Sequence, residues 1–221
     1  MIKAVLFDLD GTVADTNHLI YDSFRYTLDH HGIPDITDDE IYSHYGEPLL
    51  RTMIHYAPDV ADDLVSTYHS YNLERHDELI RPFPGVDGML KDLVTMGLKL
   101  AIVTSKRHLV ASRSLEVLGL SSLFDVVVTP EDTSKHKPEP DPVLHGAKLL
   151  NVLPSETMMV GDSPYDLLSG RQAGALTCGV EYTKLPLEML LETKPDYMIR
   201  EAHELTEIIR TLNSSGQGKR K

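Results

Sequence analysis

Two carboxylates separated by one residue stand at the end of the first apolar run of the chain. The run begins at Lys3, and Asp8 and Asp10 close it with Leu9 between them and Gly11 after them. Side chains alternate along an extended chain, so both carboxylates point to the same side. Neighbouring carboxylates repel each other unless a cation lies nearby. The pair therefore predicts a site for a hard divalent cation, for which Mg²⁺ is the typical choice.

A later apolar run ends in three residues that could bind a phosphoryl group. A lysine in a loop further along could neutralise its charge. Thr104 can donate a hydrogen bond to a phosphoryl oxygen, and the backbone N–H groups of Ser105 and Lys106, expected at a helix start, can assist it. Lys137 lies in a loop stiffened by prolines and can balance the charge of a nucleophilic carboxylate and of bound phosphate. Phosphoryl transfer needs such neutralisation around the transferred group.

A second acidic pair, Asp162 and Asp166, follows another apolar run. Ser163 and Pro164 between them are typical of a helix N-cap and of the first helical residue. This arrangement would fix Asp162 in the turn before the helix. Both carboxylates are candidate metal ligands, although a residue such as Asp166, taken alone, is more often a capping or turn residue.

The elements that must position these residues alternate along the chain. The short runs rich in Val, Ile and Leu are Lys3–Leu9, Leu98–Thr104, Asp125–Thr129, Thr157–Val160, Leu176–Val180 and a weaker Tyr197–Ile199. The helical patterns between them are Val86–Met96, Leu109–Leu118, Pro142–Leu150 and Pro164–Ala173. This alternation predicts an α/β fold with a doubly wound parallel sheet. The candidate residues would then meet at the carboxyl edge of the sheet.

One stretch interrupts the alternation with helical patterns alone. Ile20, Phe24 and Leu28 share one helical face, and residues 37–40 form a capping box. We therefore expect an α/β core made of residues 1–14 and 82–213, and an inserted α-helical cap at 15–81 over the carboxyl edge of the sheet. The polar end of the chain, residues 214–221, is expected to be a disordered tail.

The cap offers few cations for a substrate. Arg51 follows a loop at 46–48 that could face the site, which makes it a candidate substrate-binding residue. It could equally pair with Glu47, one helical turn away. The cap also contains seven histidines without zinc-site spacing, and we expect most of them at the surface. These histidines are His18, His30, His31, His44, His55, His69 and His76.

Composition excludes several kinds of partner. The 221 residues carry a net charge of −13, which would repel nucleic acid and anionic membranes. No apolar run is long enough to span a bilayer. The single Cys178 cannot form an internal disulfide, and no signal peptide is recognisable, so a cytoplasmic protein is expected. We expect a monomer or a weak homodimer.

The four motifs, in this order, resemble the signatures of the haloacid dehalogenase superfamily of phosphatases over nearly the whole chain. They are Asp8-Leu9-Asp10-Gly11-Thr12, the strand-terminal Thr104, Lys137 before a proline, and Gly161 through Asp166. The resemblance implies that Asp8 attacks phosphorus and that Asp10 acts as general acid and then as base. It also implies that Asp8, the backbone carbonyl of Asp10 and Asp162 hold Mg²⁺, with support from Asp166.

The insert resembles the small helical cap of the phosphoglycolate-phosphatase-like branch, above all of its bacterial inorganic pyrophosphatase members. The similar segments are 15–17 and 71–79. The resemblance implies a small phosphorylated substrate, either inorganic pyrophosphate or 2-phosphoglycolate, with pyrophosphate favoured.

Three other functions fit parts of the pattern. A signalling receiver domain also combines acidic residues, a threonine and a lysine, but it would be about half this length and would lack the cap. A phosphomutase acting on a sugar phosphate, such as a β-phosphoglucomutase-like enzyme, would need a cap that excludes water. A binding module without activity is disfavoured because every catalytic position is intact.

Overall fold

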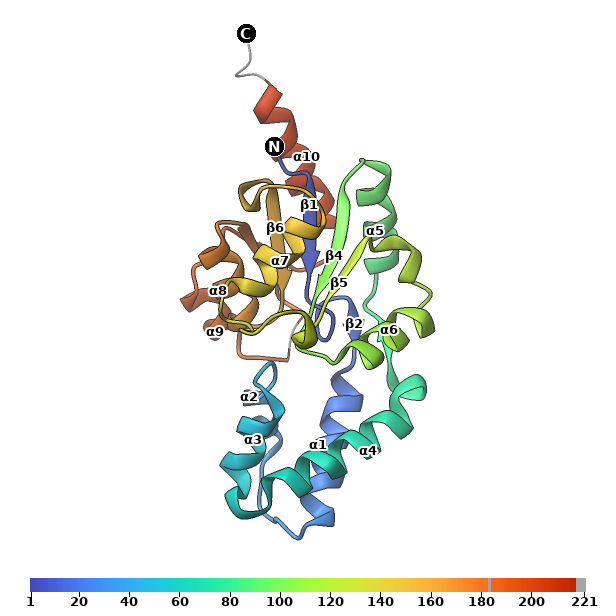
Figure 1. Cartoon of the computed structure of the whole chain (residues 1–221), viewed down its shortest axis with the longest axis vertical. Coiled ribbons are helices and arrows are strands. Elements are labelled where there is room, and N and C mark those ends of the chain that lie inside the picture. The colour runs from blue at the N-terminus through green and yellow to red at the C-terminus, as the bar shows by residue number, and fades with distance from the viewer. Residues whose placement is uncertain (183, 218–221) are drawn as a thin grey trace.

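Six short aliphatic segments form one parallel sheet in the computed structural model, which describes residues 1–182 and 184–217 (Figure 1). The strands lie in the order β5-β4-β1-β6-β7-β8, and every neighbouring pair is parallel. Their bounds are β1 Ala4–Phe7, β4 Lys99–Val103, β5 Val126–Val128, β6 Thr157–Gly161, β7 Leu176–Val180 and β8 Tyr197–Ile199. The predicted α/β class and its parallel sheet are confirmed.

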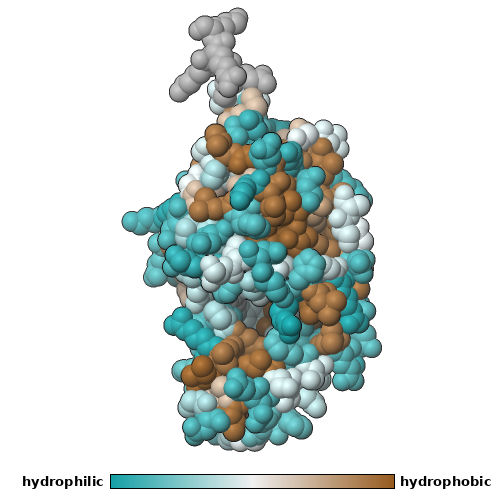
Figure 2. Space-filling view, viewed as in Figure 1, coloured by the Kyte–Doolittle hydropathy of each residue, from teal (hydrophilic) through white to brown (hydrophobic). Residues whose placement is uncertain are grey.

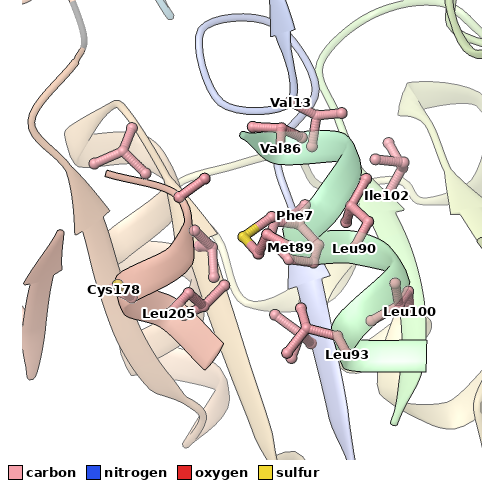
Figure 3. Packing of buried hydrophobic residues seen from close by; sticks show 14 of the residues in the cluster. Phe7, Val13, Val86, Met89, Leu90, Leu93, Leu100, Ile102, Cys178 and Leu205 are labelled. Carbon is pink, nitrogen blue, oxygen red and sulfur yellow. The ribbon is translucent and has the colours of Figure 1, made fainter. Parts of the chain in front are cut away.

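Helices cover both faces of this sheet because successive side chains of a strand point to opposite faces. Val5 and Phe7 belong to a core shared with α5 (Val86–Thr95), α6 (His108–Val117) and α10 (His203–Gln217). Figure 3 shows Phe7 against the α5 side chains in this core. Ala4 and Leu6 belong to a second core on the other face, where α7 (Asp141–Leu149) packs. There α8 (Pro164–Ala173) lies beside α7 and contacts β6 and β7.

The four helices predicted between strands lie within one residue of their expected bounds. Two C-terminal helices, α9 (Leu187–Glu192) and α10, are additional to the prediction. The disordered tail expected from residue 214 stays a prediction, and α10 continues through its first residues to Gln217. Asn213 exchanges two hydrogen bonds with the backbone of Ile2, which holds this end of the helix against the first strand. Residues 218–221 lie outside the described part of the chain.

Four helices lie between β1 and β4 in sequence: α1 (Asn17–His30), α2 (Asp38–Ser43), α3 (Leu49–Tyr56) and α4 (Ala61–Leu79). Thr37 caps α2 by accepting a hydrogen bond from the Glu40 N–H, as the capping box predicts. Phe24 and Leu28 on α1 share a core with Leu64 and Tyr68 on α4. Figure 1 shows the four helices beyond the carboxyl ends of the strands. None of the described helices combines the length and apolarity needed to cross a membrane.

The two stretches of chain that lead into and out of this helical segment lie next to each other. Ala14–Asp15 (β2) pairs antiparallel with Arg81–Pro82 (β3). Strands of two residues have no detectable periodicity, so the sequence did not predict them. The pair joins the helical segment to the rest of the chain through two adjacent crossings.

A buried histidine forms a further connection between α4 and α6. His76 is fully buried, which makes it the exception among the seven histidines of this segment, most of which were expected at the surface. Its Nε2 lies 2.8 Å from the Ser114 hydroxyl, and its Nδ1 lies 2.8 Å from Asp77. Asp77 also accepts two hydrogen bonds of 2.9 Å from Arg113. Burial lowers the pKa of His76, while the neighbouring Asp77 opposes that shift.

Candidate active site

The predicted site residues meet at the carboxyl edge of the sheet, with one exception. Asp8 follows β1, Thr104 follows β4, Asp162 follows β6, and Lys137 lies in the loop between β5 and α7. They line a cavity of about 380 Å³ between this edge and helices α1, α3 and α4. The space-filling view shows the surface hollowed where these helices meet the rest of the molecule (Figure 2). The exception is Arg51, which is exposed on α3 and is absent from the described lining.

Lys137 connects the two acidic pairs at the base of the cavity. Its Nζ donates hydrogen bonds of 2.6 Å to both Asp8 and Asp166 and one of 3.1 Å to the Val103 carbonyl. The ammonium thus uses all three of its donors while only 8% of the residue is exposed. Burial alone would lower the pKa of Lys137, but the two carboxylates raise it overall. Lys137 is therefore held in its charged form beside Asp8.

The carboxyl group of Asp8 is buried, and the nearby positive charge does not fully offset the cost of ionising it there. Burial raises the pKa of Asp8, and the charges of Asp166 and Asp10 raise it further, while Lys137 opposes them. The backbone N–H of Asp8 donates to the Val160 carbonyl, which fixes the end of β1 against β6. A cation close to Asp8 would favour the carboxylate, which is the nucleophilic form.

Oxygen atoms of Asp8, Asp162 and Asp166 lie within 4.8 Å of one another, and all three residues are buried. Lys137 contacts two of these three buried carboxylates, Asp8 and Asp166, so one ammonium offsets two negative charges in a desolvated place. Buried oxygen ligands with this excess are suited to Mg²⁺. The residues present therefore fit a divalent cation.

Asp166 has a structural role in addition. Its Oδ2 accepts hydrogen bonds from the backbone N–H and the hydroxyl of Ser163, which forms the predicted cap of α8. Its Oδ1 accepts from Lys137. Both oxygens are thus engaged with protein groups, and Asp166 positions Lys137 and the loop that carries Asp162.

Gly11 leaves the space that the carboxylate cluster of Asp8, Asp162 and Asp166 needs. It has a φ of +83°, and a Cβ at this position would collide with the Asp162 carboxylate. Gly97 has nearly the same backbone conformation, with a φ of +80°, but nothing lies within 4 Å of its Cβ position. A substitution at Gly97 would therefore cause backbone strain alone, whereas one at Gly11 would cause the same strain and also displace Asp162.

We expect Gly11→Ala to lose metal binding in addition to stability, whereas Gly97→Ala loses stability alone, by about 1 kcal/mol. Thermal unfolding with and without Mg²⁺ measures both effects, because a ligand stabilises the folded state that binds it. An equal Mg²⁺-dependent shift in melting temperature in the two variants would contradict the assignment of Asp162 to the metal site.

The loop after β4 differs in one respect from the prediction. Helix α6 begins at His108, so Ser105 and Lys106 precede the helix start instead of forming it. The N–H of Lys106 donates to the Thr104 hydroxyl oxygen at 3.0 Å, a local bond common for threonine in turns. The contact of the Lys106 N–H with phosphate therefore stays a prediction, and in this structure that N–H is engaged by Thr104. The Thr104 hydroxyl still has its own hydrogen to donate into the cavity.

The side chain of Lys106 lies in the site instead. Its Nζ is 2.7 Å from Asp10 Oδ1, and 12% of the side chain is exposed. No spacing rule pairs these two residues, which lie 96 positions apart in the chain. Only the meeting of two strand ends brings them together.

Residues of the helical segment close the other side of the cavity. The loop before α3 contributes Glu47, which contacts His44 at 3.1 Å and the Tyr165 hydroxyl at 3.4 Å. An ion pair between Glu47 and Arg51 is not among the described interactions, so neither reading of Arg51 finds support. A Cβ at Gly46 would lie 2.9 Å from the Ser163 Cβ, so this loop approaches the start of α8 closely. Helix α4 adds lining residues that the sequence did not predict: Tyr68, His69, Asn72 and Leu73.

The chain is similar to known proteins over most of its length. Residues 5–180 match the family of haloacid dehalogenase-like hydrolases. A Clostridium perfringens protein named PpaX is 45% identical over 97% of this chain and 100% of its own length. The pyrophosphatase PpaX of Bacillus pumilus is 39% identical over 94% of this chain and 96% of its own length.

The fold is shared with solved structures as well. A haloacid dehalogenase-like hydrolase from Streptococcus pneumoniae superimposes with a TM-score of 0.86 at 24% identity, covering 94% of this chain and 98% of its own. The match to the family covers most of the chain and all four motifs. The chain therefore belongs to the haloacid dehalogenase-like hydrolase family.

Proposed function

We propose that the protein is a magnesium-dependent phosphatase that hydrolyses inorganic pyrophosphate through a phosphorylated Asp8. The observation that carries this proposal is the buried contact of Lys137 with Asp8 and Asp166, at the base of a cavity that also contains Asp10 and Thr104. Pyrophosphate is favoured because relatives that match nearly the whole chain bear the name pyrophosphatase.

In the first step, a carboxylate oxygen of Asp8 forms a bond to phosphorus as the bridging P–O bond breaks. The electron pair of that bond goes to the leaving oxygen, which takes a proton from Asp10. The Thr104 hydroxyl donates to an oxygen of the transferred group, and Lys137 offsets its negative charge.

In the second step, water attacks the phosphorus of phosphorylated Asp8 and gives its proton to Asp10. The bond between Asp8 and phosphorus breaks, which regenerates the carboxylate and releases phosphate. Asp8, Asp162 and the backbone carbonyl of Asp10 would hold Mg²⁺, which neutralises phosphoryl charge when bound. Residues 15–81 act as a cap in this proposal, and residues 1–14 and 82–213 form the core.

The proposal predicts metal-dependent release of phosphate, with the highest kcat/KM for pyrophosphate. The test measures release from pyrophosphate, 2-phosphoglycolate, β-glucose 1-phosphate and p-nitrophenyl phosphate, in Mg²⁺ or in excess EDTA. A higher kcat/KM for 2-phosphoglycolate would retain the mechanism and overturn the substrate.

Absence of release from all four compounds by folded protein would contradict the phosphatase proposal itself. Conversion of β-glucose 1-phosphate into an isomeric sugar phosphate without release would identify a phosphomutase instead. Release that is undiminished in EDTA would overturn the role of Mg²⁺.

A further inference from the structure

The cations of the cavity are not equally available to a substrate. Lys137 has all three donors engaged with Asp8, Asp166 and a backbone carbonyl. Arg107 is 74% exposed at the rim, 3.9 Å from Glu131. Lys106 is the cation that combines deep burial with spare donors, because the described contacts of its ammonium use one N–H, toward Asp10.

The position of Lys106 relative to Asp10 places it beside the leaving group. A general acid must come within about 3 Å of the oxygen that it protonates. The Lys106 Nζ is 2.7 Å from Asp10 Oδ1, so it lies within roughly 6 Å of the leaving oxygen when Asp10 delivers its proton. Outer oxygen atoms of the leaving group, two bonds beyond the leaving oxygen in pyrophosphate and three in 2-phosphoglycolate, can then reach the ammonium.

Helix α4 lies across the cavity from Lys106 and Asp10. Tyr68, His69 and Asn72 line the same cavity as Asp10 and Lys106. Burial raises the pKa of Tyr68, and the charge of Asp10 across the same cavity raises it further. Burial and the nearby Arg107 lower the pKa of His69, which favours a neutral ring there. The leaving-group end of the cavity is therefore bounded by these α4 side chains on one side and, on the core side, by Lys106, whose side chain is 12% exposed.

Resting on the proposed function, we infer that Lys106 recognises the leaving group and selects phosphorylated substrates whose leaving group has a negative charge of its own. The second phosphate of pyrophosphate and the carboxylate of 2-phosphoglycolate meet this requirement. The nitrophenyl group of p-nitrophenyl phosphate and a neutral sugar do not. A charge-assisted hydrogen bond to an anionic leaving group contributes to binding only where that anion exists.

The test compares kcat/KM for pyrophosphate and for p-nitrophenyl phosphate in wild type, Lys106→Met and Lys106→Arg. Lys106→Met removes the charge and keeps much of the length, and we expect a loss on the order of 10- to 100-fold for pyrophosphate. For p-nitrophenyl phosphate the loss is expected to stay below about threefold. Lys106→Arg keeps the positive charge, so we expect it to retain most of the wild-type kcat/KM for pyrophosphate. Lys91→Met, on the exposed face of α5 and paired with Asp87, is the matched control.

The outcomes separate this inference from the proposed function. Equal losses on both substrates would mean that Lys106 only positions Asp10, and would overturn the inference. An undiminished kcat/KM for pyrophosphate in Lys106→Met would overturn it as well. Wild-type protein that releases phosphate from neither compound would instead refute the proposed function on which the inference rests. Binding of pyrophosphate to Asp8→Asn and Asp8→Asn/Lys106→Met by calorimetry provides a readout without turnover, and equal affinities would again overturn it.

Discussion

Replacing Asp8 by Asn is expected to reduce Mg²⁺-dependent phosphate release by roughly 10⁴- to 10⁶-fold, the scale seen when a nucleophile is removed. An amide cannot form the bond to phosphorus at a useful rate, although it has nearly the shape of the carboxylate. Phosphate release from pyrophosphate measures the effect. Asp87→Asn, an exposed change on α5, is the control and should retain full activity.

The same substitution should leave the metal-free protein at least as stable as wild type. Burial raises the pKa of Asp8 above its ordinary value of 3.8, so the folded protein binds a proton more tightly than the unfolded chain does. Stability due to Asp8 is therefore present at low pH and is lost as the pH rises from 3.8 through the raised pKa. Asn has no such pH dependence. The free energy of unfolding of Asp8→Asn in EDTA should therefore rise relative to that of the wild type as the pH increases. Retained activity, or a collapse in stability, would contradict the assigned role of Asp8.

Replacing Lys137 by Met is expected to damage both activity and folding. The change leaves Asp8 and Asp166 buried without the ammonium that contacts both, and breaking a buried ion pair on one side costs about 3–5 kcal/mol. Loss of a charge aimed at the transferred group should also lower kcat by about 10²- to 10³-fold. Urea unfolding in EDTA measures the stability, and phosphate release in Mg²⁺ measures the activity.

Two companion variants make this expectation sharper. Lys137→Met/Asp166→Asn removes one of the two stranded charges and should recover much of the stability without recovering activity. Lys135→Met changes an exposed lysine of the same loop and should be neutral in both measurements. A Lys137→Met protein as stable as wild type would refute the buried contacts described here.

The sequence was sufficient for the elements whose signal is local. Buried parallel strands are nearly continuous aliphatic runs, so the six strands could be predicted, and their ends identified Asp8, Thr104 and Asp162. The Ser163 cap was also predictable, because a capping residue followed by proline is a local pattern.

What the sequence could not supply depends on contacts between distant segments. His76 belongs to a weakly amphipathic helix, and its burial follows from the packing of α4 on α6. The reach of Lys106 to Asp10 depends on how two strand ends and their loops meet. Arg51 shows the limit of a prediction from the place of a loop: the side chain is exposed on α3, and its role in substrate binding stays a prediction.

The most direct test is to trap the phosphorylated protein in an Asp10→Ala variant supplied with p-nitrophenyl phosphate and Mg²⁺. The p-nitrophenolate can leave without a proton from Asp10, whereas the second step lacks its base, so the covalent form should accumulate. After acid quenching, mass spectrometry should find one phosphoryl group per protein, on the peptide that contains Asp8. A burst of p-nitrophenol without a phosphoryl group on Asp8, or with one on another residue, would contradict the account.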